Sequence, residues 1–160
     1  MGRTLRAVTA FVILVVLHYT LRPVLAWRAA PDFMMLALLL ASVRLRPGTA
    51  AVLGLAMGLV ADSVSLGALG GAALAMSVIA FAASWLKSVF FADDLALNGF
   101  FFFVGKYSFD LLYYAFQNQM SGAELAIQLF TWSLLSAAVT AVVGLIVLVL
   151  LRPMLETSPA

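Results

Sequence analysis

Six long apolar segments, with little polar sequence between them, make up most of this chain of 160 residues. Hydrophobic residues account for 65% of the chain and charged residues for only 10%, whereas soluble domains carry about 25% charged residues. So short a chain cannot hide this much apolar surface in one core, so its main solvent is lipid. The apolar runs are continuous rather than alternating, which favours helices over a β-barrel. The sequence therefore predicts an all-α, polytopic membrane helical bundle in a single domain.

The six segments are expected to be six transmembrane spans. Their limits are 5–27, 33–43, 49–61, 68–86, 95–116 and 125–151. The second and third are short for a hydrocarbon core of about 30 Å. As one re-entrant hairpin, they would place the arginines of the Arg44–Pro47 tip inside the membrane, at a cost of several kcal/mol. Two short spans, accommodated by local thinning of the bilayer or by burial, cost less, so six spans are predicted.

The distribution of basic residues predicts the orientation. With six spans and an inner N-terminus, the inner side holds Arg3, Arg6, Arg44, Arg46, Lys87 and Arg152. The outer loops hold Arg22 and Arg28. Because inner loops are enriched in lysine and arginine, both termini are expected in the cytoplasm. The basic residues are scattered, so no nucleic-acid partner is predicted.

Asp62 stands among glycines at the end of the third segment. A carboxylate there is costly unless it is paired, hydrated or capping a helix. It is therefore either a cap near the outer surface or a buried polar contact for a partner, ligand or ion. Gly54 and Gly58 form a GxxxG pattern, which lets another helix approach closely. That helix can belong to this chain or to a partner that uses this face as a groove.

Lys106 and Asp110 lie four residues apart in the fifth segment. On a helix they share a face, so a buried ion pair is predicted. The pair is either structural or part of a proton path, an ion path or a subunit contact. His18 lies alone in the first segment, and the chain has no cysteine and no second histidine to complete a metal site. It is expected to be hydrogen-bonded or interfacial.

The remaining polar features have simpler interpretations. Pro31 and Asp32 open the second segment and are expected to start its helix. The aromatic and amide residues from Tyr113 to Gln119 are typical of an outer interface belt. The sequence has no Ser/His/Asp set in a plausible order, no HExxH motif and no phosphate loop. A non-enzymatic protein without cofactor or metal is therefore predicted.

Several of these motifs resemble a known family. Ala30-Pro31-Asp32 precedes a leucine-rich short segment, and Gly58-Leu59-Val60-Ala61-Asp62 precedes Leu69-Gly70. With the chain length and the six-segment layout, this pattern resembles the rod shape-determining MreD family. Members usually carry a Ser-Gly-x-Pro-Leu-Gly type of turn after the acid. Here the turn reads Ser-Leu-Gly-Ala-Leu-Gly over residues 65–70, so the proline is missing.

The resemblance implies a subunit of the bacterial cell elongation (Rod) complex in the inner membrane. Its partners would be MreC and, indirectly, MreB and the cell-wall synthases. The fold implied is similar to the S-components of energy-coupling-factor transporters. The residues expected to serve partner binding are Gly54, Gly58, Asp62 and Gly70. The alternative is an S-component of a small-molecule uptake transporter, which should present a polar pocket at its outer face.

Overall fold

The computed structural model describes residues 2–25, 30–64, 70–90, 94–117 and 122–156, and every regular element in these ranges is helical. The first five helices are α1 (Gly2–Leu25), α2 (Phe33–Ser42), α3 (Pro47–Val64), α4 (Gly71–Phe90) and α5 (Leu95–Gln117). The last helical run is continuous and consists of α6 (Gly122–Ile127), the π-helical segment η1 (Gln128–Ser133) and α7 (Leu134–Glu156). The predicted all-α class is confirmed. Most helices extend a few residues beyond the apolar segments, because polar residues form their first or last turns.

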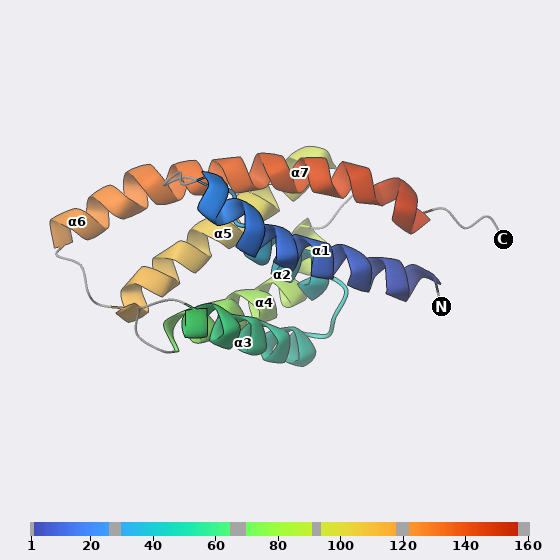
Figure 1. The fold of residues 1–160 in the computed structure, drawn as a ribbon, viewed down its shortest axis with the longest axis horizontal. Helices are drawn as coiled ribbons and strands as arrows, with labels where there is room; N and C mark the ends of the chain where they lie inside the picture. Colours follow the sequence, from blue (N-terminus) through green and yellow to red (C-terminus); the bar gives the residue numbers. More distant parts are fainter. Residues whose placement is uncertain (1, 26–29, 65–69, 91–93, 118–121, 157–160) are drawn as a thin grey trace.

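Both chain ends lie at one end of the bundle, on the right in Figure 1, together with the connection between α2 and α3. Arg44 and Arg46 are exposed in that connection. The ammonium group of Lys87, near the end of α4, donates a 3.1 Å hydrogen bond to the Leu45 carbonyl. We call this the basic end of the molecule. Arg28 lies outside the described residues, as do the side chains of the remaining arginines.

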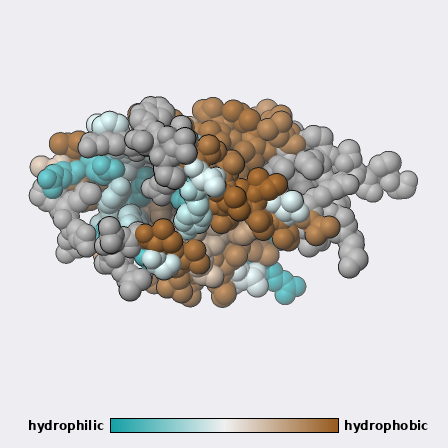
Figure 2. Space-filling model, viewed as in Figure 1, coloured by the Kyte–Doolittle hydropathy of each residue, from teal (hydrophilic) through white to brown (hydrophobic). Residues whose placement is uncertain are grey.

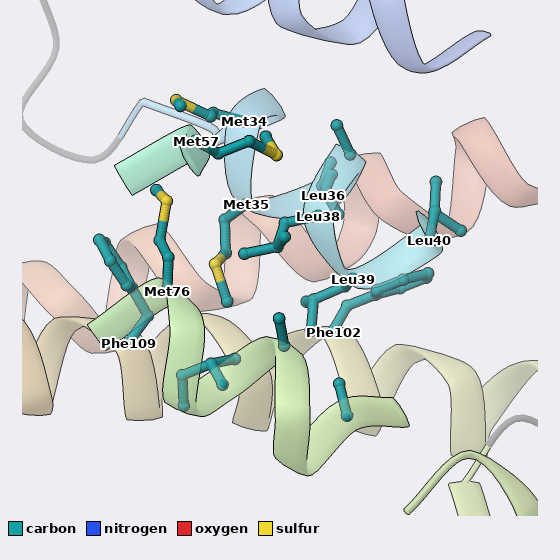
Figure 3. Close-up of a cluster of buried hydrophobic side chains, with 14 of the residues drawn as sticks. Met34, Met35, Leu36, Leu38, Leu39, Leu40, Met57, Met76, Phe102 and Phe109 are labelled. Atoms are coloured by element: carbon teal, nitrogen blue, oxygen red, sulfur yellow. The ribbon is translucent and has the colours of Figure 1, made fainter. Parts of the chain in front are cut away.

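Helix α2 is the central element of the bundle. It has 10 residues, which span about 15 Å, or roughly half of a hydrocarbon core. It contacts α1, α3, α4, α5 and α7. Figure 3 shows its methionine and leucine side chains packed among Met57, Met76, Phe102 and Phe109 of the surrounding helices. A helix that is apolar all round is stable where it is buried, so the surroundings of α2 fit the burial alternative for the second segment.

Helices α3 and α4 pack with their backbones in contact. A Cβ atom on Gly54 would lie 2.4 Å from the Met76 carbonyl oxygen, and one on Gly58 would lie 2.3 Å from the Ala73 Cα. No side chain fits at these distances, so the GxxxG pattern serves close packing within the chain. This hairpin closes one side of the bundle around α2.

The outer surface of the middle of the bundle is apolar. Exposed hydrophobic residues include Val12 on α1, Leu59 on α3 and Val142 on α7. By length and composition, Pro47–Val64 and Gly122–Leu150 are long and apolar enough to cross a membrane, within the described part of the chain. Hydrophilic side chains gather instead at the left end of Figure 2, where α6 and the end of α5 lie. Charge and polarity are therefore confined to the two ends and to the interior.

Candidate functional site: a charged cavity beyond the start of helix α2

A cavity of about 220 Å³ lies at the end of the bundle opposite the basic end. Because α2 spans only part of the bundle, the space beyond its first residue is enclosed by longer helices rather than filled by its own side chains. Besides Met34 of α2, the wall takes side chains from five further helical runs. They include His18 from α1, Asp62 from α3, Met76 from α4, Lys106 and Asp110 from α5, and Trp132 from η1. The short central helix thus makes room for the site.

Three charged side chains meet at the floor of this cavity. The Lys106 ammonium nitrogen lies 3.1 Å from Asp32 Oδ2 and 2.5 Å from Asp110 Oδ1. All three residues are buried, and Lys106 is 6% exposed. The structure has Lys106 and Asp110 in contact on one helix face, as their spacing predicted. It adds Asp32, which sequence spacing did not reveal because it lies in a different segment.

Asp32 also starts α2, as expected from its position after Pro31. Its Oδ1 accepts a 3.0 Å hydrogen bond from the Met35 amide, which is the bond of an N-cap residue. Its own amide donates to the Thr140 hydroxyl on α7 at 3.1 Å. Asp32 therefore fixes the first turn of the central helix against α7 while its second carboxylate oxygen faces Lys106.

His18 joins the same group of side chains. Its Nδ1 lies 3.3 Å from Asp32 Oδ1 and 3.3 Å from the Met34 amide nitrogen. One ring nitrogen can accept from the Met34 N–H or donate to Asp32, but it cannot do both. His18, expected to be hydrogen-bonded or interfacial, is hydrogen-bonded to Met34 and is part of a network that links α1, α2 and α5.

Backbone amides hold Asp62 in place. Its carboxylate accepts hydrogen bonds from the amides of Gly70 at 2.9 Å, Ala72 at 3.1 Å and Ala73 at 3.1 Å. These are free N–H groups at the start of α4, so Asp62 caps that helix. Gly70 has φ 105°, a conformation that glycine adopts at little cost. The geometry fits the capping alternative, and a role of Asp62 and Gly70 in partner binding stays a prediction.

The face of Gly54 and Gly58 is occupied in this structure. The backbone of α4 lies against both glycines, so it leaves no room between α3 and α4 for the helix of another protein. The groove expected along this face is thus filled by the chain's own α4. A partner-binding role for these two residues would require α4 to move.

Aromatic side chains of α5 form a further part of the wall. The Phe109 and Tyr113 rings stack with centroids 5.7 Å apart, and Tyr114 meets Tyr113 edge-on at 5.5 Å. The Tyr114 hydroxyl accepts a 3.0 Å hydrogen bond from Gln128. The two tyrosines, expected in an outer interface belt, line the cavity instead. Gln117, also expected in the belt, donates a 2.7 Å hydrogen bond to the Tyr113 hydroxyl, and residues 118–119 lie outside the described residues.

The π-helical segment η1 interrupts the long last helix at the level of the cavity. Gln128, Trp132 and Ser133 from this segment line the wall, and the Ser133 hydroxyl is hydrogen-bonded to Asp110. Short π-helical segments inside α-helices are frequent at functional sites, because they redirect side chains. No sequence signal pointed to this segment, since the apolar run through it is unbroken.

The site has the composition of a binding cavity. Within the described ranges, no group of three or more histidine, aspartate or glutamate residues could hold a metal ion. The cavity does offer carboxylates, one ammonium group, tyrosine hydroxyls and aromatic faces. These are groups that recognise a polar ligand by hydrogen bonds and charge.

Comparison with known proteins adds a family. The family model described as rod shape-determining protein MreD matches residues 1–154. Neither the curated proteins nor the solved structures give a significant match.

Proposed function

Because the chain belongs to the MreD family of rod shape-determining membrane proteins, we propose that it is a non-enzymatic subunit of the Rod complex in the bacterial inner membrane. In this role it binds MreC and, through MreC, supports MreB-guided peptidoglycan synthesis. The observation that carries the proposal is the family match over residues 1–154. The resemblance of the fold to transporter S-components stays a prediction.

The proposed topology has six spans and cytoplasmic termini. It is supported by the position of both chain ends beside Arg44, Arg46 and Lys87, since basic residues favour the cytoplasmic side. In this orientation the charged cavity opens toward the outer half of the membrane. Asp32 and Asp62 then mark the outer side, and the α2–α3 connection marks the inner side.

The partner is expected to contact the apolar outer surface rather than the space between α3 and α4. That space is closed by backbone contacts at Gly54 and Gly58. The outer faces of α1, α3 and α7 carry exposed apolar side chains, and a single-span partner can pack on such a face within the bilayer. The contact face can be found by a comparison of matched positions.

We would test the proposal by photo-crosslinking in cells. A photo-reactive amino acid replaces Val12, Leu59 or Val142, which are exposed on three different helices, and buried Leu38 serves as the control position. A crosslink to MreC is expected from at least one exposed position and from no buried one. If no position crosslinks and MreC does not co-purify in mild detergent, binding to MreC is wrong.

A second candidate function is favoured by the cavity itself. A substrate-binding subunit of an uptake transporter would present a polar cavity of this kind at the outer end of its helices. The same purification separates the two functions. Recovery of paired ATPases with a coupling membrane subunit, in place of MreC and cell-wall synthases, would favour the transporter.

A further inference from the structure

We propose that the cavity beyond helix α2 binds a primary ammonium group, carried by a soluble amine or by the ethanolamine head group of a phospholipid. This inference goes beyond MreC binding and does not depend on it. It rests on the balance of charges in the cavity, on the aromatic wall and on the available space.

The charge balance favours a cation. Among the described residues that line the cavity, the carboxylates of Asp32, Asp62 and Asp110 face a single ammonium group, that of Lys106. Three backbone amides at the start of α4 satisfy Asp62. Asp32 and Asp110 share Lys106, so the formal charges of this cluster sum to one excess negative charge when both carboxylates are ionised and His18 is neutral. A buried charge without a counter-charge is costly inside a membrane, and a bound cation removes that cost.

The aromatic wall beside Asp110 favours an organic cation. The Lys106 ammonium already lies 5.0 Å from the centroid of the Phe109 ring, which is a cation–π distance. Tyr113, Tyr114 and Trp132 continue the wall around the remaining space. A second ammonium group placed there would meet a carboxylate and electron-rich ring faces at once. A primary ammonium also brings N–H donors that the Asp110 carboxylate accepts.

The space is large enough for such a group. A volume of about 220 Å³ exceeds by far the roughly 10–15 Å³ that one water molecule needs. The wall on the η1 side is formed by the π-helical segment, which points Gln128, Trp132 and Ser133 toward the same volume. The cavity is therefore a built feature of the last helix and not only a gap beyond α2.

The first test is a titration of the purified full-length protein in phosphatidylcholine nanodiscs with ethylammonium chloride. Trp27→Phe and Trp85→Phe remove the other two tryptophans, so the tryptophan fluorescence comes from Trp132 in the cavity wall. Trp85 itself is 71% exposed on the outer surface of α4. A saturable change in Trp132 fluorescence is expected, which sodium chloride at the same ionic strength does not produce. No saturable change, or an equal change with sodium chloride, would overturn the proposal.

Variants then assign the response to the cavity. Asp110→Asn removes the excess charge and should weaken ethylammonium binding at least ~10-fold, as expected for a lost charge-assisted hydrogen bond. Asp94→Asn removes the same charge from an exposed acid outside the cavity and should leave the affinity unchanged. If Asp110→Asn does not fold, Tyr114→Phe replaces it and should weaken binding ~2- to 10-fold. Equal affinity in wild type and in every folded cavity variant would place the amine elsewhere and overturn the proposal.

Two further arms identify the source of the ammonium group. Competition of ethylammonium by phosphatidylethanolamine in the nanodisc, compared with phosphatidylglycerol, would assign the site to the lipid head group. Binding that is insensitive to lipid composition would assign it to a soluble amine. Binding that appears only after Arg28→Gln would overturn the proposal, because the chain's own arginine would then be the occupant.

Discussion

The molecule buries carboxylates in two places and satisfies them in two different ways. At the joint between α3 and α4, Asp62 is 1% exposed and accepts three backbone hydrogen bonds. Asp32 and Asp110 instead share one cation, Lys106, and Asp32 also accepts a hydrogen bond from the Met35 amide. All three acids line the cavity, but Asp62 accepts from backbone amides, whereas Asp32 and Asp110 face a side-chain cation.

The groups that compensate each carboxylate distinguish an acid with a structural role from an acid that can bind a ligand. Backbone amides at a helix start are fixed in number and position, so the three hydrogen bonds that Asp62 accepts from them fit a structural capping role. A side-chain cation shared by two carboxylates leaves charge unbalanced, and the balance can change with a ligand or a proton. A buried acid in a membrane protein is thus not in itself a sign of function. What matters is which groups compensate its charge.

The largest expected effect comes from the shared cation. Lys106→Ala leaves two buried carboxylates side by side, and loss of one partner of a buried pair costs about 3–5 kcal/mol of unfolding free energy. Lys106→Ala with Asp110→Ala restores the original excess of one negative charge, so the double variant should be more stable than the single one. Unfolding in mixed detergent micelles measures both. Losses that simply add would show that Lys106 and Asp110 do not interact.

Next in size is the cap. Asp62→Ala leaves three amides at the start of α4 without their acceptor, at a cost of about 2–4 kcal/mol. Asp62→Asn keeps one acceptor oxygen and should lose less. Neither variant should alter ethylammonium binding if the protein folds, since Asp62 is already satisfied by the backbone. A change in amine affinity in Asp62→Asn, with stability preserved, would place this acid in the binding site, and Asp62 would then not differ from Asp32 and Asp110 in role.

The glycines of the α3–α4 joint come third. Gly58→Ala would bring a Cβ atom to 2.3 Å from the Ala73 Cα, so the two helices must separate, at a cost of about 1–3 kcal/mol. Gly48, in the same helix, has no neighbour within 4 Å of such an atom, and Gly48→Ala should be neutral or slightly stabilising. Equal stability of the two variants in mixed micelles would mean that α3 and α4 are not in backbone contact.

The sequence predicted more of the α3–α4 joint than of the cavity. The all-α class, the Gly54–Gly58 packing and the capping role open to Asp62 all follow from local patterns. The Lys106–Asp110 contact follows from helical spacing. Helical spacing does not predict that Asp32 and His18 join this pair, because their positions depend on how α1, α2 and α5 pack together. The indication in the sequence was a group of polar residues at a similar depth in the predicted membrane. Such a group indicates that these residues have polar partners, but not which residues the partners are.

The smallest effect is expected from an acid that is exposed to solvent. Asp94 is exposed before α5, and its Oδ1 accepts a 2.8 Å hydrogen bond from the Ala96 amide. Asp94→Asn keeps an acceptor at this position and should change the unfolding free energy by less than ~0.5 kcal/mol. The charge removed is the same as in Asp110→Asn, so a difference between these variants measures burial and shared pairing, not charge alone. A loss of stability as large as that of Asp110→Asn would mean that Asp94 has a buried partner. The exposure of Asp94 would then not account for the difference between the two variants.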